Sequence, residues 1–320
     1  MNYRPLGQTG LNLSALSYGA SPLGGVFGDV DQATGIRTVH AAIDGGINFI
    51  DVSPYYGDTK AETVLGLALR EIKRDRYILA TKVGQYGREE FDFSAARVTR
   101  SLDESCARLG VDYIDILQCH DIEFAEVDQI VDETLPALVK LRDAGRIGHI
   151  GITGLPFKVL QAVLDRTDPG VVDTILSFCR YELNDTALAD FLPYFASKKI
   201  GVINASPTGM GLLTPRGVPG WHQATPLMIE TAQKAVAFCA QEGVDIVKLA
   251  VQFCVAHPGI TTTLVGTSKP ANIEANIRYA EEPIDHDMIN RVREILAPIN
   301  NHNFTRGLPA NRDALIPSSA

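Results

Sequence analysis

Short apolar runs, rich in residues that favour strands, recur from one end of the chain to the other. Eight of these runs have the length and composition of buried strands. They cover residues 14–20, 48–54, 77–84, 114–121, 149–155, 174–179, 201–207 and 262–267. The first seven follow one another at intervals that fit one strand and one helix. The last begins 61 residues after the seventh, from 201 to 262, so we expect an extra loop and two helices there.

Between these runs the apolar positions change to the three- and four-residue spacing of an amphipathic helix. Val39 and Ile43 share one helical face, and the glycines that follow Asp44 end that helix. In the long last interval the same spacing occurs twice, over residues 229–239 and 246–253. Strands and helices are therefore predicted to alternate along the whole chain.

The alternation of eight strands with at least eight helices predicts a (β/α)8 TIM barrel. The competing architecture, a doubly wound open sheet, usually has a G-x-G-x-x-G turn after its first strand. No such turn occurs, and the corresponding stretch reads Gly19-Ala-Ser-Pro-Leu-Gly24. Residues 3–6 and 12–13 flank a Gly-Gln-Thr-Gly turn, which predicts an N-terminal β-hairpin at the barrel floor. We expect one domain over residues 1–320, with extra helices before and after strand eight.

The charge balance narrows the classes of partner. Lys plus Arg number 29 against 38 for Asp plus Glu, and the formal net charge of -9 argues against nucleic acid or an anionic membrane as the main partner. The five cysteines form no C-x-x-C pair, so we expect free thiols in a reducing compartment. No signal-peptide pattern and no apolar run of about 18 residues occur. We expect a cytoplasmic protein, monomeric or weakly dimeric, with a small-molecule substrate.

Polar side chains stand at the ends of three consecutive predicted strands. Strand two ends near Asp51 and is followed by Tyr56, strand three ends near Lys82, and strand four ends near His120. Alone, each has a structural interpretation, such as a buried ion pair. The carboxyl ends of barrel strands, however, meet at one rim, where barrel enzymes carry their reactive groups. A carboxylate, a phenol, an ammonium and an imidazole are therefore expected to converge there.

This set suits proton transfer to or from a hydroxyl group. A free tyrosine has a pKa of about 10, too high for ready proton exchange at neutral pH. We expect the Lys82 ammonium to lower the pKa of Tyr56, while Asp51 keeps that ammonium charged and in place. His120 is suited to donate a hydrogen bond to a carbonyl or alcohol oxygen. No G-x-S-x-G elbow for acyl transfer occurs, and His120 and Glu123 lack the further ligands of a metal site.

The tetrad Asp51, Tyr56, Lys82 and His120 resembles that of the aldo-keto reductases. Five further stretches extend the likeness over nearly the whole chain: residues 4–11, 109–116, 144–151, 206–213 and 264–276. The resemblance implies that Tyr56 transfers the proton, that Lys82 and Asp51 tune it, that His120 orients the reacting oxygen, and that a nicotinamide cofactor carries the hydride. The implied cofactor-binding residues are Gly19, Ala20, Thr153, Ser177, Ser206, Pro207, Thr208, Gly209, Gly211, Gly266, Thr267, Ser268, Asn272 and Asn276.

Departures from the family pattern bear on the cofactor. Ala205 stands where many relatives place an aromatic residue against the nicotinamide, and Thr153 with Gly154 replaces a Ser-Asn pair. Asn272 stands where relatives that prefer NADP often have an arginine, and it is neutral and too short to grip a phosphate bidentately. We therefore expect NAD to be preferred over NADP, although the nearby Lys269 ammonium is able to meet a phosphate.

Four residues are expected to contact the substrate: Asp121, Arg180, Trp221 and His222. Each has an alternative interpretation. Asp121 is also suited to cap the next segment, Arg180 to pair with Glu182, and the Trp-His pair to anchor its own loop. Residues 300–304 are predicted either to fold over the barrel mouth or to be disordered.

Within the family, the likeness is nearest to the aldose 1-dehydrogenases that act on L-galactose or L-fucose. It is carried by residues 19–24, 53–57, 91–95, 119–124 and 151–156. The resemblance implies NAD-dependent oxidation of such a sugar at C1 to the lactone. An acidic side chain at Asp121 agrees with this, because carboxylates bind sugar hydroxyls. The alternatives are an NADPH-dependent aldehyde or ketone reductase and a nucleotide-sensing barrel subunit of a larger assembly.

Overall fold

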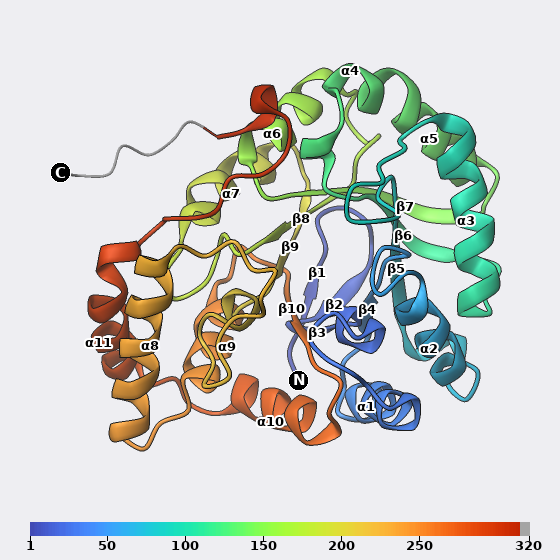
Figure 1. Ribbon diagram of the computed structural model, residues 1–320. Helices are drawn as coiled ribbons and strands as arrows, with labels where there is room; N and C mark the ends of the chain where they lie inside the picture. The colour runs from blue at the N-terminus through green and yellow to red at the C-terminus, as the bar shows by residue number, and fades with distance from the viewer. Residues whose placement is uncertain (314–320) are drawn as a thin grey trace.

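Eight parallel strands close into a barrel in the computed structural model, which describes residues 1–313 (Figure 1). Around the barrel each strand pairs with its sequence neighbour, and the last pairs with the first to complete the closure. The strands are β3 (Leu16–Gly19), β4 (Phe49–Asp51), β5 (Ile78–Val83), β6 (Ile114–Cys119), β7 (Ile147–Gly154), β8 (Thr174–Phe178), β9 (Gly201–Ala205) and β10 (Thr262–Gly266). The predicted TIM barrel is confirmed, and every predicted strand has its counterpart.

Helices surround the strands on the outside (Figure 1). They are α1 (Gln32–Asp44), α2 (Lys60–Leu69), α3 (Ala95–Leu109), α4 (Val127–Gln129), α5 (Leu135–Asp143), α6 (Phe157–Arg166), α7 (Ala187–Ser197), α8 (Pro226–Gln241), α9 (Ile246–Ala256), α10 (Pro270–Glu281) and α11 (His286–Leu296). The predicted long interval before the last strand holds α8 and α9, and α11 follows α10. Both extra helices of the prediction are therefore confirmed.

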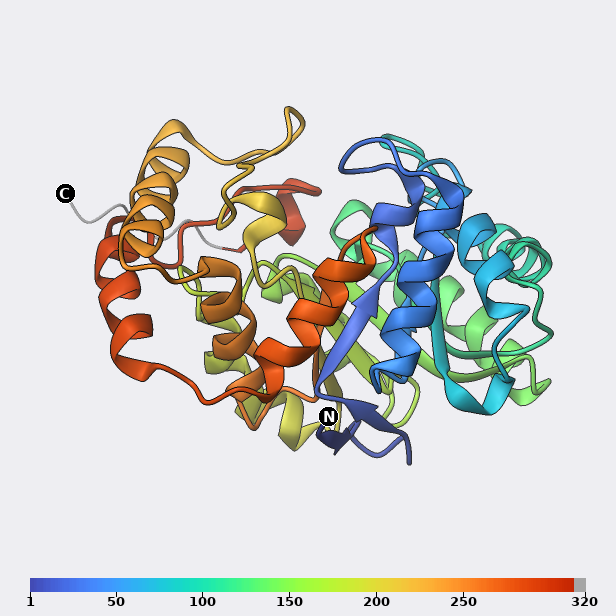
Figure 2. The same cartoon turned by 90° about the horizontal axis from the view of Figure 1, so that it is seen from below.

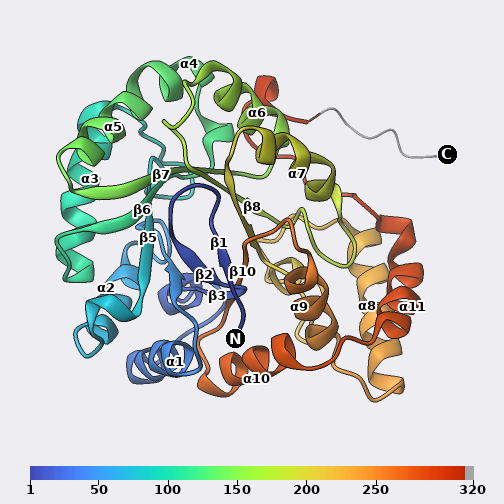
Figure 3. The same cartoon turned by 180° about the vertical axis from the view of Figure 1, so that it is seen from behind.

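The N-terminal hairpin closes the floor of the barrel, as predicted. Strands β1 (Tyr3–Pro5) and β2 (Asn12–Ser14) pair antiparallel beneath the barrel, opposite the loops that follow β3 and β9 (Figures 2 and 3). Leu6 and Leu13 are fully buried and pack into the same cluster as the inward strand residues Phe49, Ile116 and Ile203. This apolar floor excludes water from one end, which leaves the opposite rim as the open one.

The cysteines belong to the buried interior of the protein. The largest apolar cluster fills the layer between strands and helices, and it includes three of the cysteines: Cys106, Cys119 and Cys254. All five cysteines are buried and free. Within residues 1–313, no helix is both long enough and apolar enough to cross a membrane.

Candidate active site

A cavity of about 1160 Å³ opens at the carboxyl ends of the strands. It exceeds the usual size of a site for one small ligand, so it has room for a dinucleotide together with a small substrate. All four residues of the predicted tetrad line it: Asp51, Tyr56, Lys82 and His120. The cavity therefore lies on the rim where the strand ends were expected to bring these groups together.

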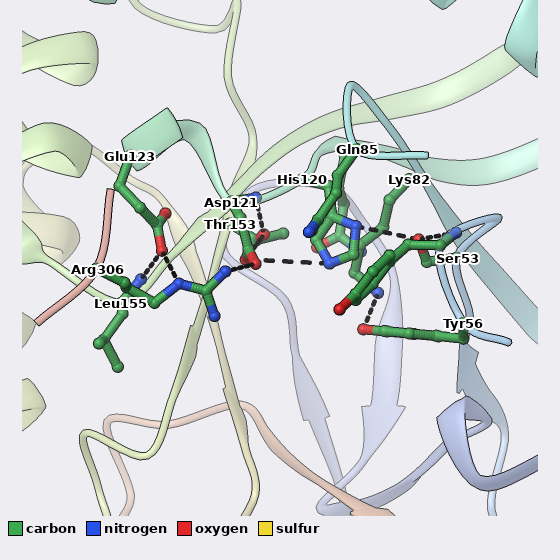
Figure 4. A network of polar contacts seen from close by, with 12 residues as sticks. Ser53, Tyr56, Lys82, Gln85, His120, Asp121, Glu123, Thr153, Leu155 and Arg306 are labelled. Atoms are coloured by element: carbon green, nitrogen blue, oxygen red, sulfur yellow. Dashed lines mark hydrogen bonds and ion pairs between the residues drawn. The ribbon is translucent and has the colours of Figure 1, made fainter. Parts of the chain in front are cut away.

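The Lys82 ammonium is the centre of a buried polar cluster. It forms an ion pair with Asp51 and donates to the Val52 carbonyl oxygen at 2.9 Å. It also donates to the Tyr56 hydroxyl at 3.2 Å (Figure 4). Asp51 also accepts a 2.7 Å bond from Gln118 Nε2. Burial opposes the charge on Lys82, but the attraction of Asp51 and Tyr56 and the hydrogen bonds to both together outweigh it and raise the pKa of Lys82. The lysine therefore stays protonated beside the phenol.

Gln118 was not predicted as a site residue, although the sequence holds a signal for it. It lies two positions before His120 on the path of β6, and side chains two apart in a strand point to the same face. Its amide fixes the second carboxylate oxygen of Asp51, whose first oxygen holds Lys82. Gln118 thus positions the ion pair without lining the cavity.

The predicted direction of the Tyr56 shift is wrong. Burial raises the pKa of Tyr56 to about 12, and the attraction of Lys82 only partly offsets it. Removing a phenol from water disfavours its charged form, and Asp51 partly cancels the field of the ammonium. In the protein by itself, Tyr56 is therefore a neutral phenol at neutral pH.

The imidazole of His120 is neutral as well. Burial lowers its pKa to about 3, against a smaller opposing effect from Asp121. Its Nδ1 lies 3.0 Å from the Ser53 hydroxyl, and its ring packs edge-on against Tyr56 with the centroids 5.6 Å apart (Figure 4). These contacts fix the ring. With a fixed neutral ring, Nε2 is suited to bond an oxygen without placing a positive charge beside it.

Asp121 lines the cavity next to His120, but its carboxylate is already paired. Arg306 donates from Nη2 to Asp121 Oδ2 at 2.6 Å, and it also lines the cavity. Burial opposes ionisation of Asp121, yet the Arg306 guanidinium together with neighbouring charges and a hydrogen bond from Thr153 outweighs it and lowers the pKa of that carboxyl. Sequence reasoning missed Arg306, since 185 residues separate the two partners. The acidic group expected for sugar hydroxyls is therefore one half of an ion pair.

Comparison with known proteins identifies the scaffold. The sequence profile described as the Aldo/keto reductase family matches residues 15–297. The chain belongs to this family. It is 49% identical over 314 residues to the L-galactose dehydrogenase of Arabidopsis thaliana, covering 96% of this chain and 98% of that protein. The protein is thus an oxidoreductase acting on CH–OH groups, in a family that uses nicotinamide cofactors.

Two further relatives agree with this assignment. The chain is 34% identical over 227 residues to the D-arabinose 1-dehydrogenase of Saccharomyces cerevisiae, covering 68% of this chain and 67% of that protein. Among solved structures it is similar to the holo form of an aldo-keto reductase from Bacillus halodurans. The TM-score is 0.76 at 26% identity, and the match covers 92% of this chain and 96% of that one.

Most residues predicted to hold the cofactor line the reductase cavity. These are Gly19, Thr153, Ser206, Pro207, Thr208, Gly211, Gly266, Thr267, Ser268, Asn272 and Asn276. Three predicted contacts lie outside the lining: Ala20, Ser177 and Gly209. Ala20 and Ser177 are fully buried, and Gly209 lies against Leu212 and Glu182, so neighbouring groups cover all three.

The loops after β9 and β10 suit the phosphates of a dinucleotide. Ser206 and Met210 have positive φ angles of 65° and 51°, and a Cβ on Gly211 would lie 2.7 Å from the Gly217 carbonyl oxygen. Helix α10 begins after Lys269 with no side chain capping its first N–H groups. Turned backbone and uncapped helix N-termini bind anions, so these residues fit the cofactor that the family uses.

Two of the residues predicted to contact the substrate, Arg180 and His222, do not line the cavity. Arg180 pairs with Asp185 at 3.8 Å and with Asp313 at 3.5 Å, not with Glu182, and it does not line the cavity. His222 lies 3.1 Å from the Gly209 carbonyl oxygen and accepts from the Ala224 amide at 2.9 Å, which also leaves it outside the lining. Carboxylates therefore lie near the Arg180 guanidinium, and backbone groups of its own loop bond the His222 ring.

Trp221 does line the cavity, where it joins two loops. Its Nε1 donates to the Val26 carbonyl oxygen at 3.1 Å, and its ring packs against Phe27 with the centroids 5.5 Å apart. The pocket-wall and loop-anchoring interpretations therefore both describe it. Residues 300–304 fold over the barrel mouth, and Phe304 lines the cavity.

Proposed function

We propose that this protein oxidises an aldose at C1 to the lactone, with NAD as the hydride acceptor. The observation that carries the proposal is 49% identity to an L-galactose dehydrogenase over 96% of the chain. The polar end of the cavity supports it, since His120, Asp121 and Arg306 offer hydrogen bonds where an apolar ketone would need apolar walls. L-galactose is the first expected substrate, and L-fucose, its 6-deoxy relative, is the second.

In this proposal Tyr56 is the proton-transfer residue. The sugar binds with its anomeric hydroxyl between Tyr56 Oη and His120 Nε2, and the imidazole holds that oxygen in place. A nicotinamide cofactor held by the loops after β9 and β10 would supply the acceptor for the hydride from C1. Tyr56 first loses its own proton, and Lys82 Nζ, 3.2 Å from the Tyr56 oxygen, stabilises the resulting phenolate. The phenolate then accepts the hydroxyl proton of the sugar and becomes a neutral phenol again. Asp51 and Gln118 keep Lys82 aimed at that oxygen.

The preference for NAD over NADP is part of the proposal. Asn272 lines the cavity and offers no positive charge to a 2′-phosphate. Asp245 also lines it and accepts a 3.0 Å bond from the hydroxyl of Tyr279, on the same helix as Asn272. A carboxylate there disfavours an added phosphate. Lys269, which lines the cavity too, is the group that would favour NADP instead.

One experiment tests both parts. Absorbance of the reduced nicotinamide is followed with a panel of L- and D-sugars, using NAD and NADP in parallel. We expect turnover of L-galactose or L-fucose, with a higher kcat/KM for NAD. A panel in which no sugar is oxidised would overturn the proposed reaction. A higher kcat/KM with NADP would overturn only the cofactor preference.

A further inference from the structure

The C-terminal strap, defined here as residues 301–311, crosses the open end of the cavity and is fastened at both ends. At its start, Asn301 accepts from the Thr186 amide through Oδ1 at 2.8 Å and donates its own amide to Asn184. At its end, the Leu308 amide donates to the Glu123 carbonyl oxygen at 2.8 Å. Asn311 adds bonds from Nδ2 to the carbonyl oxygens of Glu123 and Ala125. The strap therefore has fastening contacts besides those of the charged side chain near its middle.

That side chain is Arg306, and it is placed against the catalytic end of the cavity. Its Nη2 contacts Asp121 Oδ2 at 2.6 Å, and its Nε lies 3.1 Å from Glu123 Oε1. The guanidinium lies over the ring of Phe124, 4.9 Å from its centroid, and is 5.4 Å from that of Phe178. The side chain is 20% exposed. Its remaining nitrogen, Nη1, has no hydrogen-bond partner among residues 1–313.

His120, Asp121 and Arg306 form a row that leads away from the Tyr56 hydroxyl (Figure 4). His120 Nε2 lies 3.9 Å from Asp121 Oδ1, and Asp121 Oδ2 is held by Arg306. Along this row an imidazole is followed by a carboxylate acceptor and then by a guanidinium donor. Successive hydroxyl groups of a sugar each donate and accept, so such an alternation suits two neighbouring hydroxyls.

A purely structural role explains Arg306 less well. Burying an ion pair costs desolvation that its attraction often only repays, and apolar residues of similar size would pack as well. The neighbours Phe124 and Phe178 already offer an apolar surface. The strap is fastened by Asn301, Leu308 and Asn311 in any case.

We propose that Arg306 is a specificity-determining residue that donates from Nη1 to one sugar hydroxyl while it holds Asp121 to accept from the next. This inference rests on the proposed function, because it assigns the binding of the same sugar. A site built to bond a hydroxyl rejects the analogue that lacks it far more strongly than an apolar pocket does. Arg306 is therefore expected to select among sugars that differ by one hydroxyl.

The test compares Arg306→Gln and Arg306→Lys with the wild type on the best sugar and on its single-deoxy analogues. We expect Arg306→Gln to raise the KM for the full sugar by at least tenfold, with a smaller change in kcat. For the analogue that lacks the contacted hydroxyl, KM is expected to change less than twofold, so the discrimination collapses. Arg306→Lys is expected to recover part of it, and the Kd for NAD, measured by protein fluorescence, stays unchanged.

Arg312→Gln is the matched control. Arg312 follows the strap, is exposed, and donates from Nε and Nη2 to the Gly307 carbonyl oxygen at 3.0 and 2.8 Å. Its loss removes an arginine that fastens the strap, and the sugar selectivity is expected to remain. Equal KM increases for the full and all deoxy sugars in both Arg306 variants would show a structural role and overturn the inference. If Arg306→Gln does not fold, the selectivity of Arg306→Lys decides in the same way.

The two proposals fail in different ways. A wild-type protein that oxidises no sugar overturns the proposed function, and this inference falls with it. A wild type that oxidises sugars, together with Arg306 variants of unchanged selectivity, overturns this inference alone.

Discussion

At the scale of single residues, the cavity is organised by the pairing of buried charges. Lys82 and Asp51 are almost completely buried, and Asp121 is held by Arg306. The two groups expected to act on the reacting oxygen, Tyr56 and His120, are both neutral at pH 7, because burial disfavours their charged forms. The site therefore holds a proton donor and an acceptor without unpaired charge beside the substrate.

Tyr56→Phe tests the proton-transfer role most directly. We expect kcat to fall at least 10³-fold, because the ring remains and only the oxygen that accepts the proton is removed. Binding of NAD, followed by fluorescence, is expected to stay within twofold of the wild type. Full activity in this variant would refute the assignment of Tyr56.

The rates of oxidation and reduction are expected to depend differently on pH. Tyr56 must lose its proton before it can accept one from the sugar, and its pKa is raised to about 12. The rate of oxidation is therefore expected to rise with pH from neutral towards pH 10, while carbonyl reduction, which needs the neutral phenol, does not. Initial rates at saturating sugar and NAD measure this. An oxidation rate that is flat over this range would contradict the pKa direction.

Glu123 links charge burial to stability. Burial, followed by repulsion from Asp121, raises its pKa from 4.5 to about 8. Between these values the folded protein holds a proton that the unfolded chain releases, so Glu123 makes stability fall as pH rises from 5 to 8, by at most ~1.4 kcal/mol per pH unit. Glu123→Gln, which resembles the protonated form, is expected to lose this slope. Urea unfolding at several pH values measures it.

In Glu123→Gln the free energy of unfolding is expected to keep part of its pH dependence, because a second buried carboxyl remains. Glu182 is also fully buried, and burial, followed by repulsion from Asp185, raises its pKa to about 8. Its contribution stays in both proteins, so the difference between the two curves reports Glu123 alone. Identical slopes for the wild type and Glu123→Gln would show that Glu123 is ionised in the folded protein.

At the scale of elements, two loops at the rim touch through their backbones. Gly57, directly after Tyr56, has a φ of 63°, and a Cβ there would lie 2.0 Å from the carbonyl oxygen of Gly24. Gly24 belongs to the short helix after β3, so the contact sets the position of Tyr56 against the first loop of the barrel. Only glycine allows this approach.

Gly57→Ala is therefore expected to lower both stability and turnover. The clash and the positive φ cost about 1–3 kcal/mol, and displacement of Tyr56 lowers kcat by more than tenfold. Gly220→Ala is the control, because nothing lies within 4 Å of its added Cβ, and its effect is expected to stay within ~0.5 kcal/mol. Thermal unfolding and initial rates measure both variants. Equal behaviour of the two would contradict the argument.

At the scale of the whole molecule, the barrel separates stability from chemistry. The hairpin closes the floor, where Arg4 donates to the carbonyl oxygens of Val255, His257 and Ile260 at 2.7–3.0 Å. Val255 belongs to the last turn of α9, and His257 and Ile260 follow it, where helix carbonyls lack partners within the helix. The cavity lies at the opposite end, under the C-terminal strap, so the two ends are expected to respond independently to substitution.

Arg4→Ala tests this separation. Loss of three charge-assisted bonds is expected to lower the free energy of unfolding by about 2–3 kcal/mol, because the carbonyls lose their partner. The kcat/KM for sugar and NAD at 25 °C is expected to stay within twofold. Denaturant unfolding and steady-state kinetics on the same preparation measure both. A large fall in kcat/KM with little loss of stability would contradict the separation.

The sequence by itself determined the barrel and the place of its reactive rim. Strand and helix periods are local, and the strand ends carry Asp51, Lys82 and His120 to one edge whatever the details of packing. Only the tertiary structure decided three other points. Arg306 reaches Asp121 across 185 residues, Arg180 turns to Asp185 outside the cavity, and burial reverses the expected shift of Tyr56. The physical reason is common to all three: pairing and desolvation depend on which groups are packed together in space, and periodicity along the chain carries no record of that.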